Sequence, residues 1–560
     1  MIKISFFLVF LYALCVSALC GFVKLYALLL NFVLLYKLVV LLFVLVFFVF
    51  YINLKKKFLI NYFFANKISA NFVFNIKIIK KINFFSNSFI NFFLIVYSSI
   101  FVIALLIYFF MFNNYDGHLL LSFSNWAIYS CQLLSINFDW LIYLDFISFY
   151  FIILTTFIFF LVFLNLFSLK FKKDYSKNYF NFKLLLFLLL SIEFFLVLTF
   201  STSSIFFFFF FFEVSLLPLY ILVQVWGRGL KKKQYAMFSL LFFTLSGSIF
   251  LLCGILVMFN SLGTVDFRVL TFEKISFNTQ VLLFSLFFLG FAFKAPVFPF
   301  YSWLPEAHVE ASTSVSILLA AIFLKIASYG FLRVIVFNLG EASFYFHSLI
   351  ITFCATSIFV VFFLALTQTD LKKIIALSSI GHMNYILIGL FTYDAKAVLG
   401  ALVYMGAHAL ISSALFMLIG AIYETSNSRD LLNFSNIKNY DGKWSFFFFL
   451  FNLANISFPG FISFFCELII FTNSSFFSLL SAILIIFALF FSTIYTFWIM
   501  HNVLYGRVVK KNFFLLSKND IFSLNFLFLL VFLFGVFPFI LLKNFEQNIY
   551  VLLIKNMYNV

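Results

Sequence analysis

Six ionisable side chains lie within long apolar stretches of the sequence: two carboxylates, two lysines and two histidines. A charged side chain at the centre of a bilayer costs about 2.5–3.5 kcal/mol on insertion scales, so residues of this kind usually mark an ion path. All three side-chain types can take up and release a proton. The residues are Glu213, Lys294, Lys325, His382, His408 and Glu467. This pattern predicts proton transfer through the membrane.

Glu213 and Lys294 carry opposite charges, and each stands beside a marked local feature. Glu213 directly follows seven consecutive phenylalanines, and Lys294 lies two residues before Pro296. An ion pair favours the protonated lysine, whereas burial away from water favours the neutral amine. A lysine held between these effects can load and release a proton near neutral pH. In the alternative interpretations, Glu213 is only a structural partner for a lysine, or Lys294 extends toward an interface.

Proline and glycine residues predict interruptions in two of the membrane spans. Two prolines follow Lys294, and a Pro-Gly pair precedes Glu467. Such breaks free backbone carbonyls and admit water. Transporters built from inverted repeats carry interrupted helices at corresponding positions in their two halves. By analogy, we expect two inverted repeats with broken helices near 294–299 and 458–460.

The other three residues lie in helices without a break. Lys325 is in the middle of an apolar helix, from which its ammonium group cannot easily reach an interface. His382 and His408 are ambiguous, because a buried histidine can be a satisfied hydrogen-bonding group or a proton relay.

The amino-acid composition indicates whether water or lipid surrounds the chain. Hydrophobic residues make up 65% and charged residues 10% of the 560 residues. A soluble domain has about 45–50% apolar and about 25% charged residues, so lipid must surround most of this chain. The apolar stretches predict an all-α integral membrane protein with about fifteen transmembrane helices. The predicted helices are 2–23, 25–50, 89–112, 145–167, 184–202, 205–226, 235–259, 281–303, 312–337, 345–366, 374–392, 398–423, 446–471, 476–500 and 521–542.

Positive charge alternates between the connecting loops. Most of the 36 lysines and arginines fall in every second loop of the predicted map, and the largest basic group is the insertion 53–83. This asymmetry follows the positive-inside rule and supports the helix count, because one miscounted helix would scramble it. The net charge of +17 is then explained by topology and requires no nucleic-acid partner.

The sequence divides into three predicted regions: an N-terminal membrane region (1–144), a core (145–545) and a C-terminal tail (546–560). The first segment also resembles a secretory signal, so its retention is left open. The six cysteines form no C-x-x-C or Cys/His cluster, which predicts no iron–sulfur or zinc site.

Five segments of the core carry more specific motifs. They are FFEVSLLPLYILVQVWG (211–227), GFAFKAPVFPFYSWLPEAHVEASTSVSILLAAIFLKIASYG (290–330), TDLKKIIALSSIGHM (369–383), GAHALISSALF (406–416) and NLANISFPGFISFFCEL (452–468). Together and in this order, they resemble the antiporter-like subunits of respiratory complex I. The resemblance covers the core and leaves residues 1–144 as a divergent extension.

Glu467 narrows the resemblance. The largest antiporter-like subunit and related cation/proton antiporters typically have lysine at the corresponding position. A glutamate there, with Trp-Gly at 226–227 and Ser-Arg-Asp at 428–430, is similar to the subunit 4 branch of the family. Three residues depart from the family pattern, namely Tyr301, Glu306 and Ser312. Glu193 has no matching role in the family.

The resemblance implies roles for the intramembrane residues. Glu213 would modulate the lysine on the first broken helix, Lys325 would connect two half-paths, and Glu467 would exchange protons with the far compartment. His382 would extend the central polar axis, and His408 would line it. Protons would then move laterally through hydrated side chains.

The resemblance also implies which cofactors, partners and membrane the chain would have. The chain would hold no cofactor or metal, because NADH, FMN, the iron–sulfur clusters and ubiquinone belong to other subunits. Its partners would be other complex I subunits, notably the antiporter-like subunits 2 and 5, and membrane lipids with cardiolipin as one candidate. The Phe-rich composition suggests an A/T-rich genome, as in many organelles. The resemblance implies the mitochondrial inner membrane, with the basic loops toward the matrix. The alternatives are a subunit of a multi-subunit cation/proton antiporter and a structural spacer with an inactive path.

Overall fold

The computed structural model describes residues 144–166, 179–227, 230–270, 275–426, 428–434, 436–439, 441–474, 479–506 and 516–539. All of them lie in one compact unit of the chain, Ile100–Val560. Within these ranges the structure is helical, and the β pairing is limited to two isolated bridges. Several predictions lie outside the described residues: the spans 2–23, 25–50 and 89–112, the basic loop 53–83 and the tail 546–560.

Eleven helical segments in the described part are long and apolar enough to cross a membrane. They are α6 (Phe146–Leu166), α8 (Tyr179–Ser201), α9 (Ile205–Trp226), α10 (Leu230–Leu262), α12 (Phe277–Lys294), the run Thr313–Val336, α16 (Gly340–Leu366), α17 (Leu371–Phe391), α18 (Ala395–Ser426), α21 (Leu479–Tyr505) and α22 (Lys518–Val536). A further, interrupted span consists of α19 (Gly442–Asn455) and α20 (Ile462–Ser474). The shorter elements are α11 (Phe267–Leu270), α13 (Trp303–Glu310), η3 (Leu431–Asn433) and η4 (Ile437–Asn439). The predicted all-α membrane class is confirmed, and each span predicted after residue 144 has a helix.

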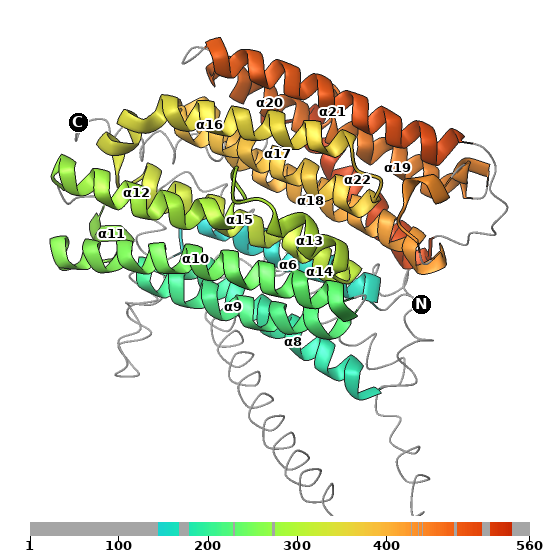
Figure 1. The fold of residues 1–560 in the computed structure, drawn as a ribbon, viewed down its shortest axis with the longest axis horizontal. Helices are drawn as coiled ribbons and strands as arrows, with labels where there is room; N and C mark the ends of the chain where they lie inside the picture. Colours follow the sequence, from blue (N-terminus) through green and yellow to red (C-terminus); the bar gives the residue numbers. More distant parts are fainter. Residues whose placement is uncertain are drawn as a thin grey trace, which may run out of the picture. The chain divides into compact units, whose positions relative to one another are not determined.

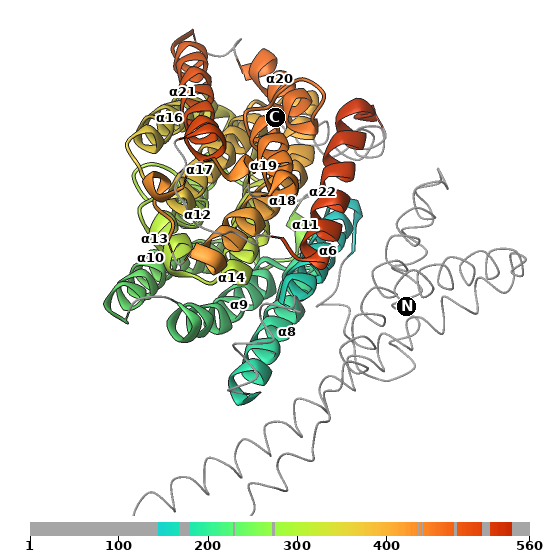
Figure 2. The ribbon, with the colours of Figure 1, turned by 90° about the vertical axis from the view of Figure 1, so that its right-hand side faces the viewer.

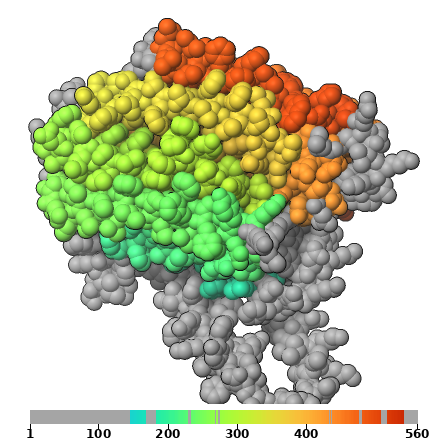
Figure 3. Space-filling view, viewed as in Figure 1, coloured from blue at the N-terminus to red at the C-terminus, as the bar shows by residue number. Residues whose placement is uncertain are grey.

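Three spans form the centre of the bundle. The apolar windows of Thr313–Val336, α17 and α18 are buried completely, whereas only 39% of the α10 window and 28% of the α22 window is buried. In Figures 1 and 2, α17 and α18 lie between α10 on one side and α21 on the other. Side chains of α10, α16 and α21 cover the face shown in Figure 3. Helices that are apolar all round are expected at such a centre, and these three carry Lys325, His382 and His408.

The connecting segments sort onto two faces. Ser204 pairs with Asp266 in an isolated bridge, so the turn after α8 lies beside the segment after α10. Asp370 pairs with Asp430, so the turn before α17 lies beside the segment after α18. In each case two spans separate the paired segments, as expected if every helix crosses once. This arrangement agrees with the charge alternation read from the sequence.

The first predicted break lies directly after Lys294. The α12 helix ends at this residue, and residues 295–302 form turns before α13 begins at Trp303. Pro296 and Pro299 have no backbone N–H, and each disfavours a helical conformation of the residue before it. The predicted break is therefore confirmed, and the helical part of the predicted span 281–303 ends at Lys294.

The second predicted break separates α19 from α20. Residues 456–461 leave the helical path, with Ser457 at φ 62° and Gly460 at φ 101°. A glycine is required at the second position, because that conformation is almost closed to residues with a Cβ. The expected single span 446–471 is thus two short helices, and the predicted break at 458–460 is confirmed. The inverted-repeat relation between the two halves stays a prediction.

The span Thr313–Val336 contains two π-helical stretches, η1 (Leu319–Phe323) and η2 (Phe331–Val336). Sequence patterns did not predict them. A π turn widens the helix and leaves backbone groups partly free, and such turns are frequent at functional sites. Here Lys325 follows η1, and its Nζ donates a hydrogen bond to the carbonyl of Ala320, at 2.7 Å.

Candidate functional site

Glu213 and Lys294 meet inside the bundle. Glu213 is on α9, Lys294 is the last residue of α12, and the lysine Nζ forms an ion pair with Glu213 Oε1. The lysine side chain is 2% exposed and the carboxylate 22%, so the pair is open mainly on the glutamate side. The Nζ also lies 4.0 Å from the ring centroid of Phe212, which adds a cation–π contact. The break after Lys294 therefore places a charged lysine end against a carboxylate.

Lys325 is buried completely and faces His408 on α18. Its Nζ lies 2.5 Å from Nδ1 of the histidine. Within the described part of the chain, no carboxylate lies within ion-pair distance of Lys325. Two cationic groups this close in a low-dielectric interior repel strongly, so the two side chains do not both carry a positive charge at the same time. The geometry is that of a donor and an acceptor that can exchange roles.

A second hydrogen-bonded cluster surrounds His382 on α17. Its Nδ1 lies 2.6 Å from the hydroxyl of Tyr404 and 3.5 Å from Glu467 Oε1, and its Nε2 lies 3.1 Å from Oδ1 of Asn455. The Tyr404 hydroxyl donates to Glu467 Oε1. All four side chains are buried. An imidazole, a phenol and a carboxylate are thus in direct contact beside the second break.

The two histidines link these clusters. The ring centroids of His382 and His408 are 5.5 Å apart. Lys325, His408 and His382 therefore continue through Tyr404 to Glu467. Of the six predicted site residues, the structure brings four into this row and pairs the other two with each other. Glu193 is buried on α8 and takes part in neither group.

Aromatic side chains occupy the space between the two groups. Phe291, one turn before Lys294, has its ring 6.4 Å from that of Phe208 and packs against Gly330. The ring of Phe208 is in turn 5.8 Å from that of Tyr329, on the helix that carries Lys325. Among the described side chains no hydrogen bond joins Lys294 to Lys325. A proton that passes between the two lysines would need water in this aromatic layer.

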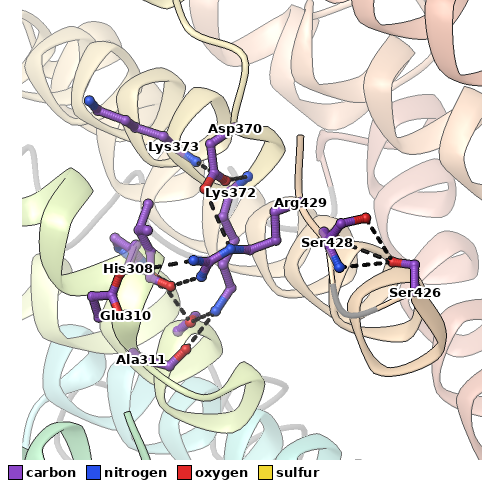
Figure 4. Close-up of polar contacts among 11 residues, drawn as sticks. His308, Glu310, Ala311, Asp370, Lys372, Lys373, Ser426, Ser428 and Arg429 are labelled. Carbon is purple, nitrogen blue, oxygen red and sulfur yellow. Dashed lines mark hydrogen bonds and ion pairs between the residues drawn. The ribbon is translucent and has the colours of Figure 1, made fainter. Parts of the chain in front are cut away.

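A polar network that sequence reasoning missed lies where α13, α17 and the segment after α18 meet (Figure 4). Arg429 donates to the carbonyl of Val309, and its guanidinium lies 3.4 Å from Asp370 and 3.9 Å from Glu310. Burial raises the pKa of Glu310, and attraction to Arg429 offsets this only in part. The Lys372 ammonium donates to the carbonyl of Ala311, at 2.7 Å. These contacts hold the helix after the first break against two distant segments.

His308 is the second residue that sequence reasoning did not select. It is buried completely, its ring stacks on Phe416 at 4.8 Å, and in the described part neither ring nitrogen has a hydrogen-bond partner. A buried polar atom without a partner is costly, and water commonly satisfies such an atom. His308 therefore marks a second point at which water is expected.

Tyr404 and Asn455 were also missed, for a physical reason. A tyrosine in an apolar helix is usually a core residue, and an asparagine at a helix end is usually a cap. Only the packing of α17, α18 and α19 shows that both side chains contact His382. The histidine at 382 was the available signal, since a buried imidazole needs partners for both ring nitrogens.

Comparison with known proteins places this geometry in a family. Residues 202–496 match the family model described as "NADH:quinone oxidoreductase/Mrp antiporter, TM". The chain is 34% identical to NADH-ubiquinone oxidoreductase chain 4 of Acanthamoeba castellanii, over 77% of this chain and 85% of that protein. It is 32% identical to NADH-quinone oxidoreductase subunit M of Rickettsia conorii, over 73% of this chain and 82% of that protein.

Solved structures share the fold. Respiratory complex I from Thermus thermophilus with bound NADH contains a similar chain, with a TM-score of 0.68, 21% identity, and coverage of 74% of this chain and 86% of that one. The Mrp complex from Dietzia sp. DQ12-45-1b contains another, with a TM-score of 0.65, 17% identity, and coverage of 75% and 85%. The family model, the relatives and the fold agree: this chain belongs to the NADH:quinone oxidoreductase/Mrp antiporter family, and its curated relatives include chain 4 of NADH-ubiquinone oxidoreductase.

Proposed function

We propose that this chain is a membrane-arm subunit of complex I that translocates protons across the mitochondrial inner membrane. The observation that carries the proposal is the buried row from Lys325 through His408, His382 and Tyr404 to Glu467. Burying so many titratable groups is costly, and a solely structural role does not require them to form a row. Electron transfer from NADH to quinone takes place in other subunits and drives this step.

The Glu213–Lys294 ion pair acts as the loading site. When the pair is closed, the carboxylate favours a protonated lysine, and when it opens, burial favours the neutral amine. Opening the pair therefore releases a proton toward Lys325 through water in the aromatic layer. Glu467, at the other end of the row, passes protons to the far compartment.

The orientation of the chain, its neighbouring subunits and its lack of cofactors follow from the same proposal. The basic loops face the matrix, and the neighbours are other complex I subunits, notably antiporter-like subunits 2 and 5, with cardiolipin among the surrounding lipids. The chain itself holds no redox centre or metal, so FMN, the iron–sulfur clusters and ubiquinone act elsewhere in the complex.

A subunit of a cation/proton antiporter is the second candidate, because the Mrp complex shares the fold. Glu467 favours complex I subunit 4, since lysine is typical at that position in the antiporters. Purification of the chain from its native membrane separates the two. Co-purification with flavin and iron–sulfur subunits supports the proposal, and co-purification with an antiporter assembly that lacks them rejects it.

The mechanism is tested with Lys294→Ala and Glu213→Ala in membrane vesicles that contain the intact complex. We expect both variants to assemble and to lose most NADH-driven proton uptake, because each removes one half of the loading pair. Unchanged proton uptake in a fully assembled Lys294→Ala complex would reject the mechanism.

A further inference from the structure

The hydroxyl of Tyr404 stands between two proton-exchanging groups. It is on α18, it lies 2.6 Å from Nδ1 of His382 on α17, and it donates to Glu467 Oε1 on α20. The direct separation between His382 Nδ1 and Glu467 Oε1 is 3.5 Å, which is longer than an ordinary N–H···O hydrogen bond. The tyrosine is 1% exposed. The short hydrogen-bonded route between His382 and Glu467 therefore passes through the phenol oxygen.

A phenol has the donor and acceptor capacity that a relay needs. Its oxygen carries one proton and two lone pairs, so it can accept from the imidazole while it donates to the carboxylate. We propose that Tyr404 relays protons between His382 and Glu467. This inference rests on the proposed proton translocation and adds a residue that the family resemblance did not supply.

The step balances without a co-reactant. The proton on Nδ1 of the His382 imidazolium moves to the phenol oxygen as the phenol's own proton moves to Glu467. The N–H and O–H bonds break together, and the products are a neutral imidazole, an intact phenol and a protonated carboxyl group. Rotation of the hydroxyl about its C–O bond then restores the starting orientation. No phenolate forms, so the burial of Tyr404 does not oppose the transfer.

Asn455 suits both protonation states of His382. Its Oδ1, 3.1 Å from Nε2, accepts a hydrogen bond when the ring is an imidazolium. The relay removes the proton from Nδ1, so Nε2 keeps its N–H in the neutral ring and still donates to the same Oδ1. The ring can therefore change charge and keep both of its hydrogen bonds, which a relay position requires.

Tyr385 provides a matched control from the same part of the protein. Its ring lies 6.3 Å from that of Tyr404, and it is buried to nearly the same extent, at 2% exposure. Its hydroxyl has no hydrogen-bond partner among the described residues. Removal of this hydroxyl leaves the row from Lys325 to Glu467 unchanged.

The experiment compares Tyr404→Phe, Tyr404→Ser and Tyr385→Phe in vesicles with the intact complex. Phenylalanine fills the space of the tyrosine but cannot carry a proton, whereas serine leaves room for a water molecule that can bridge His382 and Glu467. We expect the Phe variant at 404 to reduce NADH-driven proton uptake by at least about tenfold. We expect the Ser variant to recover a clear part of the activity and Tyr385→Phe to match the unmodified complex.

A packing role predicts the opposite order, because serine removes far more buried volume than phenylalanine does. Normal proton uptake by Tyr404→Phe, or a Ser variant that assembles but pumps less than the Phe variant, would overturn the relay. Should the Phe variant fail to assemble, Tyr404→Gln takes its place, since a glutamine can bond to both neighbours but cannot pass a proton readily. A Gln variant that pumps normally overturns the relay.

Lys294→Ala in the same vesicles separates the two proposals. Loss of proton uptake in Lys294→Ala combined with normal uptake in Tyr404→Phe rejects only the relay. Normal uptake in Lys294→Ala rejects the proposed mechanism of proton translocation, on which the relay depends.

Discussion

Lys325 Nζ lies 2.5 Å from Nδ1 of His408, and the two side chains come from different fully buried spans. Among the described residues, the ammonium group also donates to the carbonyl of Ala320, which is part of the π turn η1. A lysine placed in this way has a proton acceptor on one side and a neutral dipole on the other. Lys325 can therefore transfer a proton without first breaking a strong ion pair.

Replacement of Lys325 by arginine tests this relationship. Arginine keeps the positive charge and comparable bulk, but it does not release its proton at accessible pH. We expect Lys325→Arg to assemble and to lose proton uptake by at least about tenfold, and we expect the same loss for Lys325→Met. Vesicle proton uptake at matched complex content is the measurement. Retention of pumping by the arginine variant would show that Lys325 acts only through its charge.

The Arg429 network tests how the helix after the first break is held. Arg429→Ala removes the contacts to Val309, Asp370 and Glu310 together and takes away a cation that pairs with two partly buried carboxylates. We expect Arg429→Ala to lower the free energy of unfolding by about 3 kcal/mol, because a buried charge that loses its partner costs about 3–5 kcal/mol. The measurement is the amount of chain in the assembled complex on native gels.

Arg429→Lys is the matched control for this network. Lysine keeps the charge but lacks the planar guanidinium that reaches several acceptors at once, so an intermediate amount of assembled complex is expected. Normal assembly of Arg429→Ala would show that the network does not fix α13.

The ion pair of Arg333 with Asp145, at the start of α6, predicts a dependence on pH. Burial alone would raise the pKa of Asp145, but Arg333 and the hydrogen bonds with Ser148 outweigh burial and lower this pKa. An acid with a lowered folded-state pKa stabilises the fold above its unfolded pKa of about 3.9 and loses that contribution as the pH falls through the folded value. We therefore expect the contribution to be complete at pH 7 and to decline only in strong acid.

Asp145→Asn measures the size of that contribution. The amide cannot balance Arg333, whose side chain is only 8% exposed, so we expect the thermal midpoint of the purified complex at pH 7 to fall. The double variant Asp145→Asn with Arg333→Met removes both charges and should recover part of the loss. A double variant that is less stable than Asp145→Asn would contradict the stabilising role of the Arg333–Asp145 ion pair.

Gly330 tests the packing between the two lysines. A Cβ at this position would clash with the ring of Phe291. We expect Gly330→Ala to displace that ring and to cost about 1–3 kcal/mol, as overpacked cores do. The thermal midpoint of the complex checks the prediction. Gly442→Ala is the control, since a Cβ there meets no atom within 4 Å and should leave the midpoint nearly unchanged.

The sequence by itself determined the membrane class, the two breaks and the set of charged residues within the spans. Hydropathy and charge alternation specify where each span lies, because lipid excludes unpaired polar groups and the loops carry the charge. Prolines and a glycine mark both interruptions, since their backbone restrictions act locally. Glu213, Lys294, Lys325 and Glu467 are recognisable from the sequence as well, because a charged side chain is rare inside an apolar stretch.

The tertiary structure alone decided which of these residues touch. The contact of Lys325 with His408 and the position of Tyr404 between His382 and Glu467 each join spans far apart in the sequence. No local pattern encodes them, because Tyr404 has the same hydrophobic character as any core aromatic residue. The Arg429 network was missed because its polar residues lie in loops and short helices that look solvent-exposed in sequence. Only the packing of the span Thr313–Val336 with α17, α18 and α20 turned separate titratable residues into a row.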